Sequence, residues 1–145
     1  MGTQKHIQEI RNFNRFYTDL IGLLDNHLLN SDYSLAEARI LYEIFTANQL
    51  SASDIIHNLS IDKGYLSRIL KKFEKQDLVV RRSSDEDARV SLLSLTGKGL
   101  NVFRELNDAS NQQIATLIST IAVSQLDELV QHMKAIAALL DRSGR

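Results

Sequence analysis

The chain has 145 residues, with 17 basic and 18 acidic side chains, and it contains no cysteine, tryptophan or proline. A chain of this length forms one domain, or one domain with an extension. The missing cysteines exclude a disulfide framework, a thiolate zinc site, an iron–sulfur cluster and a thiol redox sensor. The missing prolines favour long helices, because proline interrupts a helix interior.

Nothing in the sequence suggests a membrane or an export signal. No segment approaches 18 consecutive apolar residues, so we expect no membrane-spanning helix. The first residues mix charged and apolar side chains and lack the apolar stretch of a secretory signal. We therefore expect the protein to be cytoplasmic.

Apolar residues spaced three and four apart predict a series of amphipathic helices. The first helix is expected over about 7–29. A second helix begins after Ser34, which has the capping-box spacing with Glu37, so that each side chain can bind a free backbone N–H. Ser51 and Asp54 repeat this spacing at the start of a short third helix.

A turn and a change of period follow the third helix, which stops at Ser60. Asp62 is the expected N-cap of a fourth helix, which runs to about Gln76. From Leu78 onward the apolar residues alternate instead of following the helical period. Two such runs around a long polar loop predict a β-hairpin with a protruding tip.

Two more helices are expected after the hairpin. Thr96 can cap a long helix, and Ser124 and Asp127 have the capping-box spacing at the start of the last one. The terminal helices carry more apolar surface than a small domain covers by itself, which predicts a two-fold dimer. An intramolecular helix bundle is the alternative. The predicted fold class is mainly α-helical, a winged helix-turn-helix flanked by N- and C-terminal dimerisation helices.

The net charge of −1 hides a segregation of charge along the chain. Residues 63–104 hold ten basic and five acidic side chains, a net charge of +5, which leaves −6 for the rest. A basic segment on an acidic body is typical of a surface that binds a polyanion.

The fourth helix carries most of this positive charge. Its apolar residues fall within about 100° of the helix circumference and predict a buried face. The opposite face is cationic, and it would offer Arg68 for guanine edges and lysines for phosphates. Gly64 would permit a close approach of the backbone. The residues predicted to contact DNA from this helix are Lys63, Gly64, Tyr65, Ser67, Arg68, Lys71 and Lys72.

A simpler interpretation is that a lysine-rich helix face is only solvated. Two features favour DNA binding. The preceding short helix and tight turn have helix-turn-helix spacing, and the hairpin that follows carries Arg81, Arg82 and Arg89. Together they predict a winged helix, with one helix for the major groove and one flap for the backbone or minor groove.

The tip of the predicted wing allows two interpretations, because three acidic residues surround Arg89. Asp87 and Arg89 form only a local ion pair in one of them. In the other, Asp87 orients an arginine of the wing or of the neighbouring helix, and Arg89 reaches a minor groove.

Two other function classes find less support. His6, His27, His57 and His132 lack metal-ligand spacing, and the sequence has no Gly-rich phosphate loop and no nucleophile elbow. We therefore expect no enzyme activity, no metal and no cofactor. A winged helix that binds only proteins would not need cations on the exposed face of the fourth helix.

The segment DKGYLSRILKKFEKQDLVVRR, the wing pattern Asp87-x-Arg89 and the sequel Leu95-Thr96-x-x-Gly99 resemble the MarR family of bacterial regulators. The resemblance covers nearly the whole chain. It implies one MarR-type domain over 1–145, with a winged helix-turn-helix at 34–96 and dimerisation helices at 1–30 and 105–145. It further implies a homodimer that inserts two recognition helices into a palindromic duplex.

Carried over to this sequence, the resemblance places the DNA-contacting residues predicted on the fourth helix in a recognition helix, and the arginines of the hairpin in a wing. The predicted wing contacts are Arg81, Arg82, Ser83, Ser84, Asp87 and Arg89, and Ser51 and Ser53 are cap residues expected near DNA. The family also implies a small aromatic or anionic effector. The segments that could line its cleft carry Phe16, Tyr17, His27, Tyr33 and Tyr42, for which a plain core role is the alternative.

A second resemblance concerns FNRFYTDLIGLL, YSLAEARILYEI and IDKGYLSRILKKFE. These segments are similar to the regulator half of proteins that fuse this domain to a GNAT-type acetyltransferase. An acetyltransferase domain would need about another 100–150 residues. The chain is thus either a free-standing regulator or one half of a longer protein.

Overall fold

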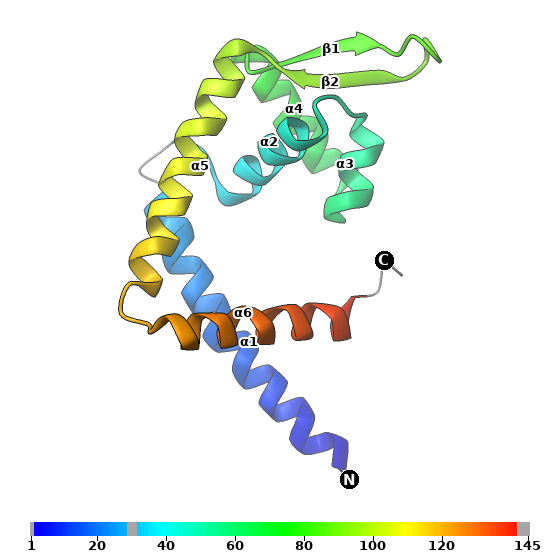
Figure 1. Ribbon diagram of the computed structural model, residues 1–145. Coiled ribbons are helices and arrows are strands. Elements are labelled where there is room, and N and C mark those ends of the chain that lie inside the picture. The colour runs from blue at the N-terminus through cyan, green and yellow to red at the C-terminus, as the bar shows by residue number, and fades with distance from the viewer. Residues whose placement is uncertain (1, 29–31, 142–145) are drawn as a thin grey trace. The chain divides into compact units, whose positions relative to one another are not determined.

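The structure is a computed structural model that describes the backbone of residues 2–28 and 32–141 and the side chains of residues 2–24 and 32–141. Within this range the elements are α1 (Gly2–Leu28), α2 (Leu35–Ala47), α3 (Ala52–Leu59), α4 (Lys63–Lys75), β1 (Val79–Ser83), β2 (Ser91–Leu95), α5 (Gly97–Ile118) and α6 (Val123–Leu140). This order confirms the predicted, mainly α-helical fold with a β-hairpin wing (Figure 1). The chain forms two compact units, residues 1–110 and 111–145. No helix within the described ranges is long and apolar enough to cross a membrane.

Both predicted capping boxes of the helix-turn-helix region are present. At α2, the Glu37 N–H donates to Ser34 Oγ over 3.1 Å, and the Ser34 N–H donates to Glu37 Oε1 over 2.9 Å. At α3, Ser51 and Asp54 exchange the same two bonds, each 3.1 Å long. At the start of each helix, two backbone N–H groups are thus bonded to side-chain oxygens.

The last two helices begin differently from each other. Thr96 caps α5 as predicted, because its Oγ1 accepts from the Gly99 N–H over 2.9 Å. The predicted cap at Ser124 is wrong: α6 begins at Val123, and its N-cap is Ala122, which makes no side-chain cap bond. Ser124 lies in the first turn of α6, two residues after the N-cap, so it does not occupy the capping position.

The wing is a two-stranded antiparallel hairpin in which Val79 pairs with Leu95 and Ser83 with Ser91 (Figure 1). A third segment joins it at Leu50, just before α3. The Leu50 and Leu93 backbones exchange two hydrogen bonds, of 3.2 and 2.7 Å. The helix-turn-helix and the wing are therefore tied together by backbone pairing as well as by side chains.

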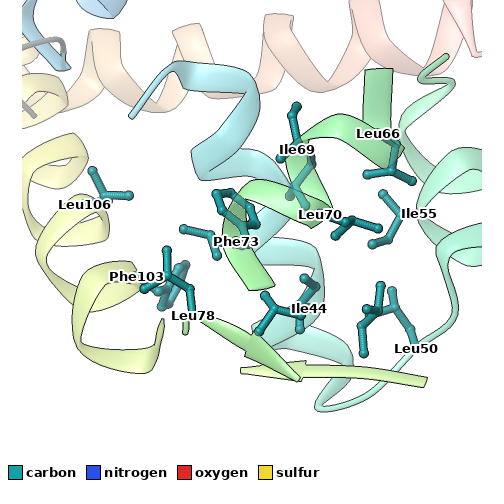
Figure 2. Close-up of a cluster of buried hydrophobic side chains, with 14 residues drawn as sticks. Ile44, Leu50, Ile55, Leu66, Ile69, Leu70, Phe73, Leu78, Phe103 and Leu106 are labelled. Carbon is teal, nitrogen blue, oxygen red and sulfur yellow. The ribbon is translucent and has the colours of Figure 1, made fainter. Parts of the chain in front are cut away.

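One apolar cluster holds the helix-turn-helix together, and α4 contributes the largest part of it (Figure 2). The four apolar residues predicted to form the inner face of α4 are all buried. They pack with residues from α2, α3, both strands and the first turns of α5. The complete cluster is Ile40, Leu41, Ile44, Leu50, Ile55, Leu66, Ile69, Leu70, Phe73, Leu78, Val79, Leu93, Phe103 and Leu106.

The first turn of α5 lies directly against the chain that leads into β1. The Thr96 N–H donates to the Leu78 carbonyl over 3.0 Å, and Thr96 Oγ1 donates to the Asp77 carbonyl over 2.6 Å. Gly99 is buried here, and a Cβ added to it would lie 2.0 Å from the Leu78 carbonyl oxygen. Only glycine fits this contact without a shift of the backbone.

The terminal helices leave their apolar residues uncovered within the single chain. Helix α6 has no buried residue along its 18 residues, and the described side chains of α1 are exposed or only partly buried. The exposed apolar residues of α1 include Ile7, Ile10, Phe13, Phe16, Tyr17 and Leu23, and those of α6 include Val123, Leu129, Val130, Met133, Ile136, Leu139 and Leu140.

Candidate nucleic-acid interface

Helix α4 is positioned by a short turn and a strong cap. Residues 60–62 separate it from α3, and Ser60 takes up the left-handed conformation, with φ of 50°. Asp62 is the N-cap as predicted, because its Oδ2 accepts from the Tyr65 N–H over 2.9 Å. The buried apolar face then orients the helix so that its opposite face points to solvent.

That outer face carries the residues expected to contact DNA. The exposed members are Lys63, Gly64, Tyr65, Ser67, Arg68 and Lys71, and Lys75 is exposed beside them. Lys63, Arg68 and Lys71 form no ion pair among the described residues. The guanidinium of Arg68 lies over the Tyr65 ring, with its central carbon 5.9 Å from the ring centroid. Within the described part of the chain, the face thus offers three cations that form no ion pair with a carboxylate.

Lys72, also a predicted DNA contact, has a protein partner. Its Nζ lies 2.7 Å from Oε2 of Glu37, a residue that is only 8% exposed. The same Nζ lies 5.6 Å from the centroid of the Tyr33 ring. Lys72 therefore links α4 to the start of α2, and its ammonium group is paired with the Glu37 carboxylate.

The pKa of the Glu37 carboxyl reflects this environment. Burial by itself raises the pKa, but hydrogen bonds from Lys72 and from the Ser34 N–H, together with the charge of Lys72, outweigh burial and lower it below its usual value. A carboxyl with a lowered folded-state pKa stabilises the fold above its unfolded-state pKa. This stabilisation is lost as the pH falls through the folded-state pKa.

We expect Glu37→Gln to lower the free energy of unfolding by about 1–2 kcal/mol at pH 7, because Lys72 loses a charged hydrogen-bond partner. The difference from the unmodified protein should shrink as the pH falls through the lowered folded-state pKa of Glu37, because Glu37 is then protonated in both states. Urea unfolding at several pH values measures this. Asp54→Asn is the control for a capping carboxylate that forms no ion pair among the described residues. A change in the free energy of unfolding that does not depend on pH would contradict a stabilising ion pair between Glu37 and Lys72.

The body of the wing presents one cation and ties down another. Nε of Arg81 donates to Glu74 Oε1, which connects β1 to the last turns of α4. Arg82 is exposed and forms no ion pair among the described residues. Ser83 is exposed at the end of β1, and Ser84 Oγ accepts from the Glu86 N–H over 3.2 Å. Arg82 is therefore the arginine of β1 best placed to meet an external anion.

At the tip of the wing, Asp87 binds the arginine two residues away. Nε and Nη2 of Arg89 donate to its two carboxylate oxygens, each over 3.1 Å, and the Arg89 N–H donates to Oδ1 over 3.0 Å. These bonds lower the pKa of Asp87, with the side-chain bonds contributing most. The Arg89 side chain is still 90% exposed. Asp87 thus orients Arg89 itself, in a local pair that leaves the arginine accessible from outside.

The two serines expected near DNA differ in role. Ser51 is the cap of α3, and its Oγ accepts from the Asp54 N–H. Ser53 is exposed in the first turn of the same helix. Of these two serines, Ser53 is therefore the one with an exposed side chain.

The residues expected to line an effector cleft lie in different surroundings. Phe16 and Tyr17 are exposed on α1, and the side chain of His27 lies outside the described residues. Tyr33 packs at 6.4 Å from Phe73, and burial raises its pKa. Tyr42 borders a hollow of about 170 Å³ between α2 and α5. Its other lining residues are Leu35, Ala38, Arg39, Phe103, Leu106, Asn107 and Ser110.

The structure adds residues that the sequence analysis missed. Glu37 and Glu74 were assigned no role toward the cations of the interface, yet they pair with Lys72 and Arg81. Arg39, which borders the hollow beside Tyr42, was not singled out. The seven-residue distance between Glu74 and Arg81 spans a helix end and a strand, so no periodic pattern would have revealed that pair.

Residues 33–91 match the MarR family, from just before α2 to the start of β2. This segment of the chain belongs to the MarR family. The matched segment contains every residue of the candidate interface, from Ser51 before α3 to Arg89 at the wing tip. The resemblance found in the sequence is thereby confirmed. The further likeness to acetyltransferase fusion proteins stays a prediction.

Curated relatives and a solved structure agree with this assignment. The HTH-type transcriptional regulator MhqR of Bacillus subtilis (strain 168) is 18% identical over 134 residues, which cover 92% of each chain. The HTH-type transcriptional regulator MgrA of Staphylococcus aureus is 25% identical over 121 residues, covering 83% of this chain and 78% of MgrA. The fold is similar to that of a MarR mutant from E. coli complexed with operator DNA. That similarity has a TM-score of 0.76 at 21% identity and covers 92% of this chain and 96% of the other.

Proposed function

We propose that this protein is a transcriptional regulator, without enzyme activity, that binds double-stranded DNA sequence-specifically as a homodimer. The observation that carries the proposal is the two-sided character of α4. One face is buried in the core, and the opposite face exposes Lys63, Arg68 and Lys71 without protein carboxylate partners among the described residues. A helix of this kind after a tight turn suits insertion into the major groove.

The wing supports the same function from a second element. Arg82 on β1 and Arg89 at the tip are exposed cations on a hairpin that follows α4 directly. In the proposed complex they contact the phosphate backbone or a minor groove. Lys72 and Arg81 have a supporting role instead, because their carboxylate partners already hold them against α2 and α4.

The proposed homodimer would cover the apolar faces of α1 and α6. A two-fold dimer places two recognition helices about one turn of duplex apart, roughly 34 Å, and so requires a palindromic operator. The family match, and the operator complex formed by the similarly folded MarR protein, support this arrangement.

A small aromatic or anionic effector belongs to the same proposal. The hollow beside Tyr42 combines apolar walls with the Arg39 side chain, and Arg39 forms no ion pair among the described residues. An anion with an apolar body would match both features.

Selection of binding sites from a random duplex pool tests the function and the symmetry together. We expect enrichment of an inverted repeat whose half-sites are centred about 10 base pairs apart. The selection should be run at two salt concentrations, because phosphate contacts make affinity fall as salt rises. Failure to enrich any motif would reject sequence-specific binding. A single, unrepeated half-site would reject the two-fold arrangement alone.

Sedimentation velocity tests the homodimer without DNA. We expect a mass of twice the 16.4 kDa of the chain at micromolar concentration. Ile136→Glu, on the exposed apolar face of α6, should shift the protein toward the single-chain mass, because a charge buried at an interface is costly. Gln131→Glu, an exposed polar position of the same helix, is the control. A single-chain mass for the unmodified protein would contradict the homodimer.

A further inference from the structure

The side chain of Arg68 is held by its own helix. Its guanidinium carbon lies 5.9 Å from the centroid of the Tyr65 ring, three residues earlier. Residues three apart lie side by side on a helix, so the ring and the guanidinium meet without bending the backbone. A guanidinium over an aromatic face is attracted by the negative charge density of that face.

Gly64 lies beside the guanidinium of Arg68. A Cβ added at Gly64 would lie 3.7 Å from Nη1 of Arg68 and 3.2 Å from Oδ2 of Asp62. The guanidinium therefore lies back over the first turn of α4, near the carboxylate of the N-cap. That carboxylate is itself fixed, because it accepts from the Tyr65 N–H over 2.9 Å.

These contacts set Arg68 apart from the other cations of the exposed face. Lys71 is exposed on the same helix and forms no cation–π contact or ion pair among the described residues. An arginine that is ordered before binding loses less conformational entropy when it forms a two-bond contact with a guanine. A lysine that meets a phosphate needs no such order, because it acts as a point charge.

We propose that Tyr65 is a positioning residue that holds Arg68 ready to bind a guanine edge in the major groove. This assignment rests on the proposed DNA-binding function and deepens it. Tyr65 acts through Arg68, so the information about the base sequence comes from the guanidinium. Tyr65 is 39% exposed and lies outside the buried cluster, so its replacement leaves the core intact.

The DNA arm of the test uses the full chain and the duplex obtained by selection. Tyr65→Phe keeps the ring, whereas Tyr65→Leu removes it. We expect Tyr65→Leu to lose about two- to five-fold in discrimination at the base pair where Arg68→Ala also loses discrimination, and Tyr65→Phe to keep it. Tyr65→Leu should cause no further loss when Arg68 is already alanine. Combined with Lys71→Ala, which weakens binding to all duplexes alike, Tyr65→Leu should still lose the same two- to five-fold in discrimination.

Two results in this arm would overturn the assignment. One is a loss of discrimination by Tyr65→Leu at a different base pair, which would mean that Tyr65 makes a base contact of its own. The other is multiplication of the Tyr65→Leu and Arg68→Ala losses, which would mean that the two residues act independently.

A DNA-free arm separates this assignment from the proposed function. The Nε–Hε resonance of Arg68 should show a ring-current shift in the unmodified protein and in Tyr65→Phe, and Tyr65→Leu should abolish it. If the unmodified protein selects no duplex, the proposed function fails. The recognition of guanine by Arg68 then fails with it, even if the ring-current shift is present. If the unmodified protein binds its operator but Tyr65→Leu changes neither the shift nor the discrimination, only the positioning role fails.

Discussion

Arg68→Ala is expected to weaken binding to the selected operator by about 1–3 kcal/mol and to relax the preference for guanine at one position of each half-site. Arg68 is the arginine on the exposed face of α4, and its guanidinium can form two parallel bonds with the O6 and N7 atoms of guanine. Alanine removes both bonds and keeps the helix, since alanine is the best helix former. Fluorescence anisotropy titrations on the operator and on guanine-substituted duplexes measure the effect.

Lys71→Ala is the matched control on the same face. A lysine that contacts phosphate supplies affinity without sequence preference, so its loss should weaken binding to operator and random duplexes alike. It should also flatten the dependence of log affinity on log salt by about one unit. An Arg68→Ala protein that binds operator and random duplexes as the unmodified protein does would mean that α4 is not the recognition helix.

Gly99→Ala is expected to lower the free energy of unfolding by about 3 kcal/mol, the upper end of the range for overpacked sites. The added Cβ would lie 2.0 Å from the Leu78 carbonyl oxygen and 2.9 Å from the Leu78 carbonyl carbon. Backbone atoms cannot rotate away as a flexible side chain can. Relief therefore requires α5 to move away from the chain before β1, which disturbs the burial of Phe103 and Leu106. Urea unfolding followed by circular dichroism measures the loss.

Gly97→Ala provides the comparison within the same turn. A Cβ added at Gly97 meets nothing within 4 Å, and the residue is exposed. Alanine there should be neutral or slightly stabilising, because it restricts the unfolded chain and favours the helix. Equal stability of the Gly99→Ala and Gly97→Ala proteins would show that the close contact with Leu78 is not maintained in solution.

Much of the helix-turn-helix could be predicted from local patterns. The caps at Ser34, Ser51, Asp62 and Thr96 form as expected, because a cap joins residues two or three positions apart. The buried face of α4 also follows from its helical period. The one wrong cap, at Ser124, shows the limit: spacing alone does not say at which residue the first backbone hydrogen bond forms.

The candidate interface was predictable in outline but not in the roles of its cations. Composition and periodicity place Arg68, Lys71, Lys72 and Arg81 on α4 and the wing. They cannot tell that Lys72 meets Glu37, which lies 35 residues earlier, on a different helix. A pairing between distant residues depends on how elements pack, and packing is settled by the shape of the whole core.

The order of the elements, the family resemblance and the exposed face of α4 follow from the amino-acid sequence, because each depends on residues that are neighbours along the chain. Which cations stay available to a ligand depends on the folded arrangement of the helices and strands. Folding brings the carboxylates of Glu37 and Glu74 to Lys72 and Arg81, and it leaves Arg68 over the ring of Tyr65. The physical reason is that Coulomb attraction acts between groups close in space, and sequence separation does not report that distance.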